Sequence, residues 1–380
     1  MLRSIVRSPG CGDTRSRLPR WSGTALRRLA ASVLCAAFLW PAASAEAQFR
    51  PFLPPEGQSF FGVSDNGRAS GFRNFAQTVG KHPAVIETYH PWDNSLNQAI
   101  PRWREVRARP MLHISTVDQD GHEVITPRGI ALGKGDEYLL RLNRRFVGAG
   151  IRAYIRPLGE PNRCLNAWAA IDCSGSARAE RYSPKWYRQA FRRIYVIVHG
   201  GGRRWEINRR LKRIGLPGIR RSGGREPRKL PKAPVAVIWS PLPGGSPGGS
   251  RNRPGRFWPG YRWVDWVGTD FYSRYPHWKD LRRFYRRFAK RTDKPFALTE
   301  WGIWGSDSPR FARQVFSFAG THEHARMLVY YQDFGTSNPF RIQNFPGSRE
   351  VIERRLESDR YPAFAPHYPR PLPTYGGITR

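Results

Sequence analysis

Short apolar runs alternate along the chain with segments in which nonpolar residues recur every three or four positions. The first pattern is typical of buried strands, and the second of helices that bury one face. The apolar runs predict eight strands, at Ser59–Val63, Ala84–Tyr89, Pro110–Ser115, Tyr154–Pro157, Val235–Trp239, Trp263–Tyr272, Phe296–Thr299 and Arg326–Tyr331. Helical spacing predicts helices over Gly71–Val79, Leu96–Arg107, Lys134–Phe146, Ser183–His199 and Leu281–Lys290. Strands that alternate with helices in this way favour one closed α/β barrel, the (β/α)8 TIM barrel.

The N-terminal segment does not fit this alternation. Residues 1–47 combine arginines with an apolar run from Leu29 to about Ala43, which is too short to span a bilayer comfortably. Small residues at Ala43-Ser-Ala45 offer a cleavage site, so we expect a signal peptide with a short leader and an exported mature chain. The pair Arg27-Arg28 leaves twin-arginine export open, and an uncleaved anchor is the other alternative.

The rest of the chain shows no linker that would divide it. We expect residues 48–360 to form the barrel domain and residues 361–380 to form a proline-rich tail. Two Gly/Pro-rich stretches, 200–234 and 241–260, are expected to be long loops.

The cysteines agree with export. Cys11 and Cys35 would leave with the signal peptide, so Cys164 and Cys173 remain as a pair nine residues apart. In an exported chain such a pair predicts a disulfide, here one that would hold the loop after Glu160. Two free buried thiols are the alternative.

The charge is strongly positive. The formal charge is +35, and removal of residues 1–45, which hold seven arginines and one aspartate, leaves 57 basic and 28 acidic residues, or +29. Such an excess predicts attraction to polyanions, such as an acidic glycan or an anionic cell wall. In Leu281–Phe288 the arginines fill positions between helically spaced aromatics, which is typical of a solvated helix face. No aromatic-basic module of a known RNA or DNA type is present, which argues against nucleic acid as the partner.

Two glutamates stand where predicted strands end. Glu160 follows the run Ala153–Pro157, and Glu300 follows Pro295–Thr299, 140 residues later. In a parallel barrel all strands end at the same mouth, so the two side chains can converge. Two carboxylates about 5–5.5 Å apart are what a retaining glycosidase needs, one as the acid and one as the nucleophile. For either glutamate, an ion pair with a barrel arginine such as Arg156 is the structural alternative.

Several stretches resemble the clan A glycoside hydrolases, and more narrowly glycoside hydrolase family 26, which includes endo-β-mannanases. The similar stretches span most of the mature chain and are Ile125–Ala131, Ile155–Asn162, Val237–Pro241, Trp263–Tyr272 and Lys294–Gly302. The order and spacing of these motifs carry the resemblance, because no single one of them is specific.

The resemblance implies a secreted retaining glycoside hydrolase that cleaves a β-linked polysaccharide, a β-mannan or a related β-glycan, without a cofactor. By that similarity Glu160 is the acid/base, Glu300 is the nucleophile and Tyr272 orients the nucleophile. The expected substrate contacts are Arg156, Asn162, Trp239, Trp301 and Tyr331.

The sequence also departs from the family pattern. Gly159 stands where the family usually has His before the acid/base. The family also commonly has Trp a few residues after the Asn that corresponds to Asn162, whereas here the nearest tryptophan is Trp168, beyond Cys164. Both changes fall at the cleavage subsite. A barrel that binds glycan or anionic wall polymer without turnover is therefore the alternative function. The run His322-Glu-His324 lacks the i, i+4 spacing of a metal motif, so we expect the start of a helix there and no metal.

Overall fold

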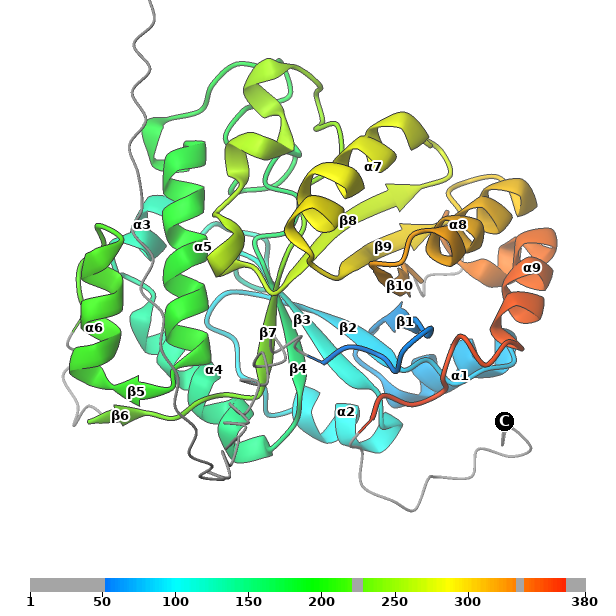
Figure 1. Cartoon of the computed structure of the whole chain (residues 1–380), viewed down its shortest axis with the longest axis horizontal. Coiled ribbons are helices and arrows are strands. Elements are labelled where there is room, and N and C mark those ends of the chain that lie inside the picture. The colour runs from blue at the N-terminus through cyan, green and yellow to red at the C-terminus, as the bar shows by residue number, and fades with distance from the viewer. Residues whose placement is uncertain (1–51, 221–227, 333–337, 367–380) are drawn as a thin grey trace, which may run out of the picture. The chain divides into compact units, whose positions relative to one another are not determined.

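The computed structural model describes residues 52–220, 228–332 and 338–366, which form a closed barrel of parallel strands surrounded by helices (Figure 1). The barrel strands are β1 (Phe60–Ser64), β2 (Val85–His90), β3 (Arg109–Ile114), β4 (Ala153–Pro157), β7 (Val235–Trp239), β8 (Trp266–Tyr272), β9 (Phe296–Gly302) and β10 (Ala325–Tyr330). They follow one another around the barrel in chain order, and β10 pairs with β1 to close it. The predicted (β/α)8 TIM barrel is confirmed.

Helices connect these strands and bury one face against the outside of the barrel or, as α6 does against α5, against a neighbouring helix (Figure 1). They are α1 (Ala69–Thr78), α2 (Ala99–Val106), α3 (Pro127–Ala131), α4 (Asp136–Ala149), α5 (Pro184–His199), α6 (Arg204–Arg213), α7 (Trp278–Phe284), α8 (Pro309–Thr321) and α9 (Pro346–Leu356). A π-helical turn, Tyr285–Ala289, continues α7. The amphipathic spacing seen in the sequence is therefore the spacing of the faces that cover the barrel.

Three segments differ from the sequence-based expectation. The expected loop 200–234 contains α6 between two short antiparallel strands, β5 (Gly202–Arg203) and β6 (Lys229–Leu230). Strand β9 continues to Gly302, so Glu300 lies inside a strand rather than after it. The expected helix start at His322 is wrong, because His322 caps the C-terminus of α8 and the chain then enters β10.

Alternate residues of each barrel strand face opposite sides, as the strand period requires. One set fills the barrel interior and includes Met111, Tyr154, Ile238, Trp266 and Val329. The neighbouring positions belong to a second, larger core between the strands and the helices. Toward the carboxyl ends of the strands, the inward positions change from apolar to polar, and this change creates the candidate site.

At the opposite end of the barrel, the interior is closed by segments from both ends of the described chain. The guanidinium of Arg109 donates to the carbonyl oxygens of Phe52 and Pro366, and the hydroxyl of Tyr154 donates to the same Phe52 carbonyl. The expected signal segment 1–47 and residues 367–380 of the expected tail lie outside the described residues. Among the residues that are described, no helix has the length and apolar character needed to cross a membrane.

Candidate active site

The candidate site is built from inward-facing side chains at the carboxyl ends of the strands. Because successive inward positions are two residues apart, β2 contributes both Glu87 and Tyr89, and β8 contributes both Asp270 and Tyr272. Strand β3 contributes His113, β4 contributes Arg156, the residue after β7 is Ser240, and β9 contributes Glu300. The parallel order of the barrel thus gathers residues from distant parts of the chain at one mouth.

Arg156 lies at the centre of this group and is fully buried. Its Nη1 donates to Glu87 Oε1 at 2.7 Å and also to Glu300 Oε1. Its Nη2 donates to Asp270 Oδ2, and its Nε donates to Ser240 Oγ at 2.7 Å. One guanidinium therefore orients three carboxyl groups that come from β2, β8 and β9.

Glu300 is held from two sides. Arg156 binds one carboxyl oxygen, and the hydroxyl of Tyr272 donates a hydrogen bond to the other, Oε2. Tyr272 is the residue that the sequence resemblance assigns to this contact. The arrangement fixes the orientation of the carboxyl group and supplies a positive charge beside it.

Glu160 is placed by a strained turn. Leu158 and Glu160 both adopt left-handed backbone angles, with φ of +51° and +48°, which are uncommon for residues with a side chain. The backbone N–H of Glu160 donates to Ser240 O at 2.7 Å, and the Nε1 of Trp168 donates to Gly159 O at 2.9 Å. These contacts hold the turn, and the Glu160 carboxyl accepts from Arg163 Nη1 at 3.1 Å.

The structure gives a physical reason for glycine at position 159. A Cβ atom there would lie 2.8 Å from Arg156 Nη2 and 2.9 Å from His113 Nε2. The backbone N–H of Gly159 donates to that same His113 nitrogen at 3.2 Å. The imidazole of His113, which comes from β3, thus occupies the space that a side chain at position 159 would need.

Burial and like charges control protonation in the site. Burial raises the pKa of Glu87 to about 8, and it raises the pKa of Asp270 well above its ordinary value. Burial also raises the pKa of Glu160, and the nearby charge of Glu300 adds to this effect. Burial and then the Arg156 charge lower the pKa of His113 well below its ordinary value, so its ring is neutral at pH 7. The site therefore combines Glu160, a carboxyl group whose pKa is raised, with Glu300, a carboxyl group held against a cation.

The loop after Glu160 is fixed by Asn162 and by a disulfide. Cys164 and Cys173 are joined, as the sequence predicted. Asn162 was expected to contact substrate, but its side chain is fully buried. Its amide pairs with the backbone of Leu242, donating to the carbonyl at 2.9 Å and accepting from the N–H at 2.8 Å. In this structure Asn162 joins two loops instead of facing a ligand.

Two of the expected aromatic contacts do not line the mouth. Trp239 and Trp301 are both fully buried and belong to the core between strands and helices. Trp239 packs against Phe284 of α7, and Trp301 packs against Phe316 of α8. The physical reason is the strand period, because each is the outward neighbour of an inward residue. Tyr331 is half-buried, and its ring makes an edge contact with Tyr272 at 6.1 Å, so it does lie beside the carboxylates.

Sequence reasoning missed four polar residues of the site, Glu87, Tyr89, His113 and Asp270. Each was inside a predicted strand and was assigned no function. The available signal was a polar residue at an alternate position near the carboxyl end of an otherwise apolar strand. Arg156, expected to touch substrate, lies beneath the carboxylates and orients them.

One group of these side chains has the composition of a metal site. Ligand atoms of Glu87, His113 and Glu300 lie within 4.8 Å of one another. However, Arg156 Nη1 already donates to both of these glutamates, so the protein itself supplies the positive charge at this position. We therefore assign the cluster to carboxylate positioning. The site thus places two carboxyl groups in different surroundings at one barrel mouth, and glycosyl transfer through two carboxyl groups uses such a pair.

Comparison with known proteins identifies the fold. No family model matches the sequence, and no curated protein matches it. Among solved structures, a Bacillus subtilis mannanase has a TM-score of 0.52 and 14% identity, covering 82% of this chain and 88% of that chain. A GH26 β-mannanase from Bacteroides ovatus has a TM-score of 0.52 and 16% identity, with coverage of 81% and 91%. A double mutant of a Cellulomonas fimi endo-β-1,4-mannanase has a TM-score of 0.54 and 14% identity, with coverage of 82% and 73%. The chain therefore has a fold like that of glycoside hydrolase family 26.

Proposed function

We propose that this chain is a secreted retaining glycoside hydrolase that cleaves a β-linked polysaccharide, a β-mannan or a related β-glycan. The observation that carries the proposal is the pair Glu160, in the turn after the fourth barrel strand, and Glu300, near the carboxyl end of the seventh, with Arg156 and Tyr272 holding Glu300. The fold shared with mannanases supports it. In this proposal residues 48–360 are the catalytic domain, and the predicted signal peptide and the disulfide support export.

The mechanism follows from the different surroundings of the two glutamates. Glu300, oriented by Arg156 and Tyr272, attacks the anomeric carbon and forms a glycosyl ester. Burial and the Glu300 charge raise the pKa of Glu160, which favours its protonated form, and Glu160 donates this proton to the departing glycosidic oxygen. Once the ester has formed, the Glu300 charge is gone and the pKa of Glu160 falls. Glu160 then takes a proton from the water that cleaves the ester, and anomeric configuration is retained.

The test is a reducing-sugar assay of the parent chain and Glu300→Gln on β-mannan, β-glucan, xylan and acidic glycans. The amide keeps the shape of the side chain but cannot form the ester, so we expect turnover to fall by several orders of magnitude. Glu105→Gln, on the exposed face of α2, is the control and should keep parental turnover. A Glu300→Gln variant with more than about a tenth of the parental rate would contradict the nucleophile role. A parent chain that binds a glycan but hydrolyses none would favour the non-catalytic alternative.

The positive surface charge favours an anionic partner. We propose that this charge holds the enzyme on an acidic glycan or an anionic cell wall. The contact residues proposed here lie on α6, where Trp205 is 53% exposed and the guanidinium carbon of Arg209 lies 5.0 Å from its ring centroid. Lys212, also exposed, follows one turn later on the same face. An aromatic ring can stack on a sugar while the cations face its acidic groups.

Retention on isolated cell walls should fall steeply between roughly 50 and 200 mM salt, because screening acts on exposed charges. Turnover of a small neutral oligosaccharide should change far less over the same range. Retention should also drop in the triple variant Trp205→Ala, Arg209→Gln and Lys212→Gln. Retention on cell walls that does not change with salt concentration would contradict this role of the surface charge.

A further inference from the structure

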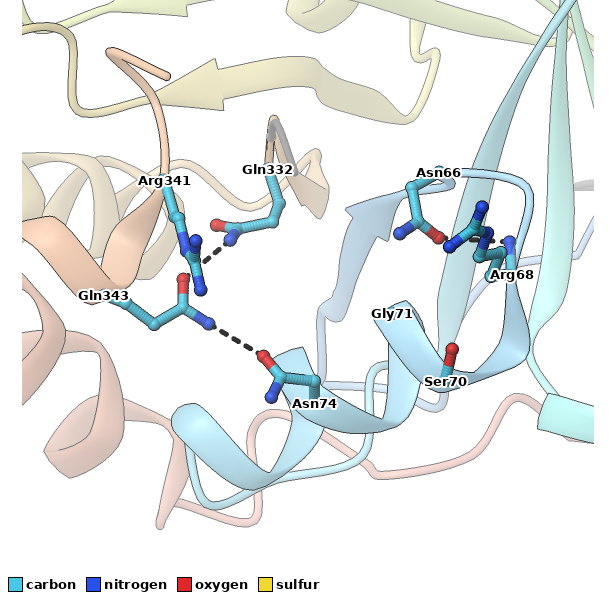
Figure 2. Close-up of a pocket in the computed structure, with 8 residues that line it drawn as sticks. All are labelled: Asn66, Arg68, Ser70, Gly71, Asn74, Gln332, Arg341 and Gln343. Carbon is cyan, nitrogen blue, oxygen red and sulfur yellow. Dashed lines mark hydrogen bonds between the residues drawn. The ribbon is translucent and has the colours of Figure 1, made fainter. Parts of the chain in front are cut away.

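A polar pocket lies beside the candidate active site, at the same barrel end. It has a volume of about 320 Å³ and is lined by Asn66, Arg68, Ser70, Gly71, Asn74, Gln332, Arg341 and Gln343. The first five residues belong to the turn after β1 and to α1, and the other three follow β10 (Figure 2). Because β1 and β10 are paired, the turns that follow them meet at the mouth of the barrel.

The chain connects this pocket directly to the carboxylates. Gln332 is preceded by Tyr331, whose ring contacts Tyr272 with 6.1 Å between centroids. The hydroxyl of Tyr272 in turn donates to Glu300. A ligand that extends along the mouth from Glu300 would therefore meet the pocket wall next to Tyr331.

The wall of the pocket is a fixed network of amides. Gln332 is almost fully buried, and its Nε2 donates to Gln343 Oε1 at 2.8 Å. Gln343 Nε2 donates onward to Asn74 Oδ1 at 3.1 Å (Figure 2). Gln332 Oε1 accepts from the backbone N–H of Ile342 at 2.9 Å. Each amide orientation is thus determined by its neighbour, so the pocket is formed before any ligand arrives.

Two arginines face this pocket without acidic partners. Arg341 lies beside Gln332 and Gln343, and Arg68 lies on the other side near Asn66 (Figure 2). Within the part of the chain that the structure describes, neither guanidinium has a hydrogen bond or an ion pair. The nearby Arg102 differs, because it is bound by Asp65 with an Nη2–Oδ2 distance of 2.6 Å. None of the lining residues that the structure describes is acidic, so this described wall presents two arginines that no acid within it neutralises.

We propose that this pocket binds the carboxylate of a uronic acid unit on the glycan whose backbone crosses Glu160 and Glu300. Arginine pairs with carboxylates through directed, charge-assisted hydrogen bonds, and the amides match sugar hydroxyls. The volume is at the low end of small-molecule pockets, roughly 300–1,000 Å³, which suits one sugar unit. This inference rests on the proposed function and narrows its substrate to an acidic or acid-decorated β-glycan.

The test measures binding of glucuronate, glucose and inorganic phosphate to the full chain by titration at low salt, with no catalytic readout. We expect glucuronate to bind at least about tenfold more tightly than glucose, because glucose lacks the charge. Arg68→Gln, Arg341→Gln and the double variant should each lose glucuronate affinity, with a loss of about tenfold or more in the double variant. Arg73→Gln is the matched control, since Arg73 also lies on α1 but pairs with Glu105, and it should bind like the parent.

The outcomes separate this proposal from the proposed function. Glucuronate binding that is absent, or that survives in the double variant, overturns the pocket assignment even if the chain hydrolyses a glycan. Arginine-dependent binding by a chain that hydrolyses nothing supports the pocket and counts against the hydrolase. If phosphate binds through the two arginines and glucuronate does not bind, the proposal that the pocket recognises a carboxylate is wrong. The single variant Arg68→Gln keeps the test interpretable, because the Arg68 side chain is exposed and its replacement should leave the fold intact.

Discussion

Arg109 and Arg156 stand on the neighbouring strands β3 and β4, both buried, but at opposite ends of the barrel. Arg109 closes the end where the strands begin, and its guanidinium meets two backbone carbonyls, the Tyr154 hydroxyl and the face of the Phe60 ring at 5.2 Å. Arg156, where the strands end, meets three carboxyl groups. The same residue type is thus used with neutral partners at one end and with acids at the other.

This difference separates a structural role from a chemical one. Carbonyl oxygens and aromatic faces hold Arg109 without changing protonation at any catalytic group. Three acids around Arg156 exceed its single charge, so burial and mutual repulsion raise the pKa values of Glu87 and Asp270. Barrels generally place stability at the first end and catalysis at the second.

Replacing each arginine by methionine should separate the two roles. Arg156→Met removes the cation that orients Glu300, so we expect turnover to fall by roughly 10²–10³-fold or more. Arg109→Met should leave turnover of the folded enzyme near parental. Both variants should lose stability. Arg156→Met leaves buried acids without their cation, which typically costs roughly 3–5 kcal/mol, whereas Arg109→Met leaves buried carbonyl oxygens without a donor, at roughly 1–3 kcal/mol each. Activity per folded molecule, together with urea unfolding, measures both quantities.

Equal loss of turnover in the two variants would contradict a structural role for Arg109 and a chemical role for Arg156. Arg156→Lys serves as a further control. A lysine keeps the charge but cannot reproduce the fork of donors that reaches Glu87, Asp270 and Glu300, so it should recover stability better than activity.

Gly159→Ala should give a smaller effect at the mouth. The added Cβ would approach Arg156 Nη2 to 2.8 Å, and Arg156 is held by its carboxylates, so Arg156 or His113 must shift. We expect turnover to fall by about tenfold to a hundredfold, because small misplacement of reacting groups is costly. Gly148→Ala is the matched control. Nothing lies within 4 Å of its added Cβ in α4, so that variant should match the parent or be slightly more stable.

The sequence was sufficient to predict the barrel, because eight apolar runs separated by amphipathic segments leave few other arrangements. The pairing of Glu160 with Glu300 stays a prediction, drawn from two expected strand ends. The disulfide followed from an even cysteine count. The positions of the strand ends did not reveal that Arg156 binds three carboxyl groups. These groups come from β2, β8 and β9, and they meet Arg156 only because the barrel closes. The prediction that Trp301 contacts substrate was based on its position next to Glu300. Side chains alternate along the strand, so Trp301 faces the helices instead.

Glu87 provides the smallest and most specific prediction. Its pKa is raised by burial from 4.5 to about 8, so between these pH values the folded state holds a proton that the unfolded state releases. Its contribution to the free energy of unfolding is therefore complete below about pH 4.5 and declines as pH rises toward 8. Above pH 8 no further decline comes from this group.

Glu87→Gln should flatten this pH dependence without breaking the contact to Arg156. The amide oxygen can still accept from Nη1, but the side chain no longer ionises. We expect urea unfolding of the parent to show a larger fall in stability from pH 5 to pH 8 than that of Glu87→Gln, while Glu105→Gln falls as the parent does. Some decline should persist in the variant, because burial also raises the pKa values of Asp270 and Glu160. Identical slopes for the parent and Glu87→Gln would mean that Glu87 is ionised throughout, and that Arg156 compensates its acids more fully than burial opposes them.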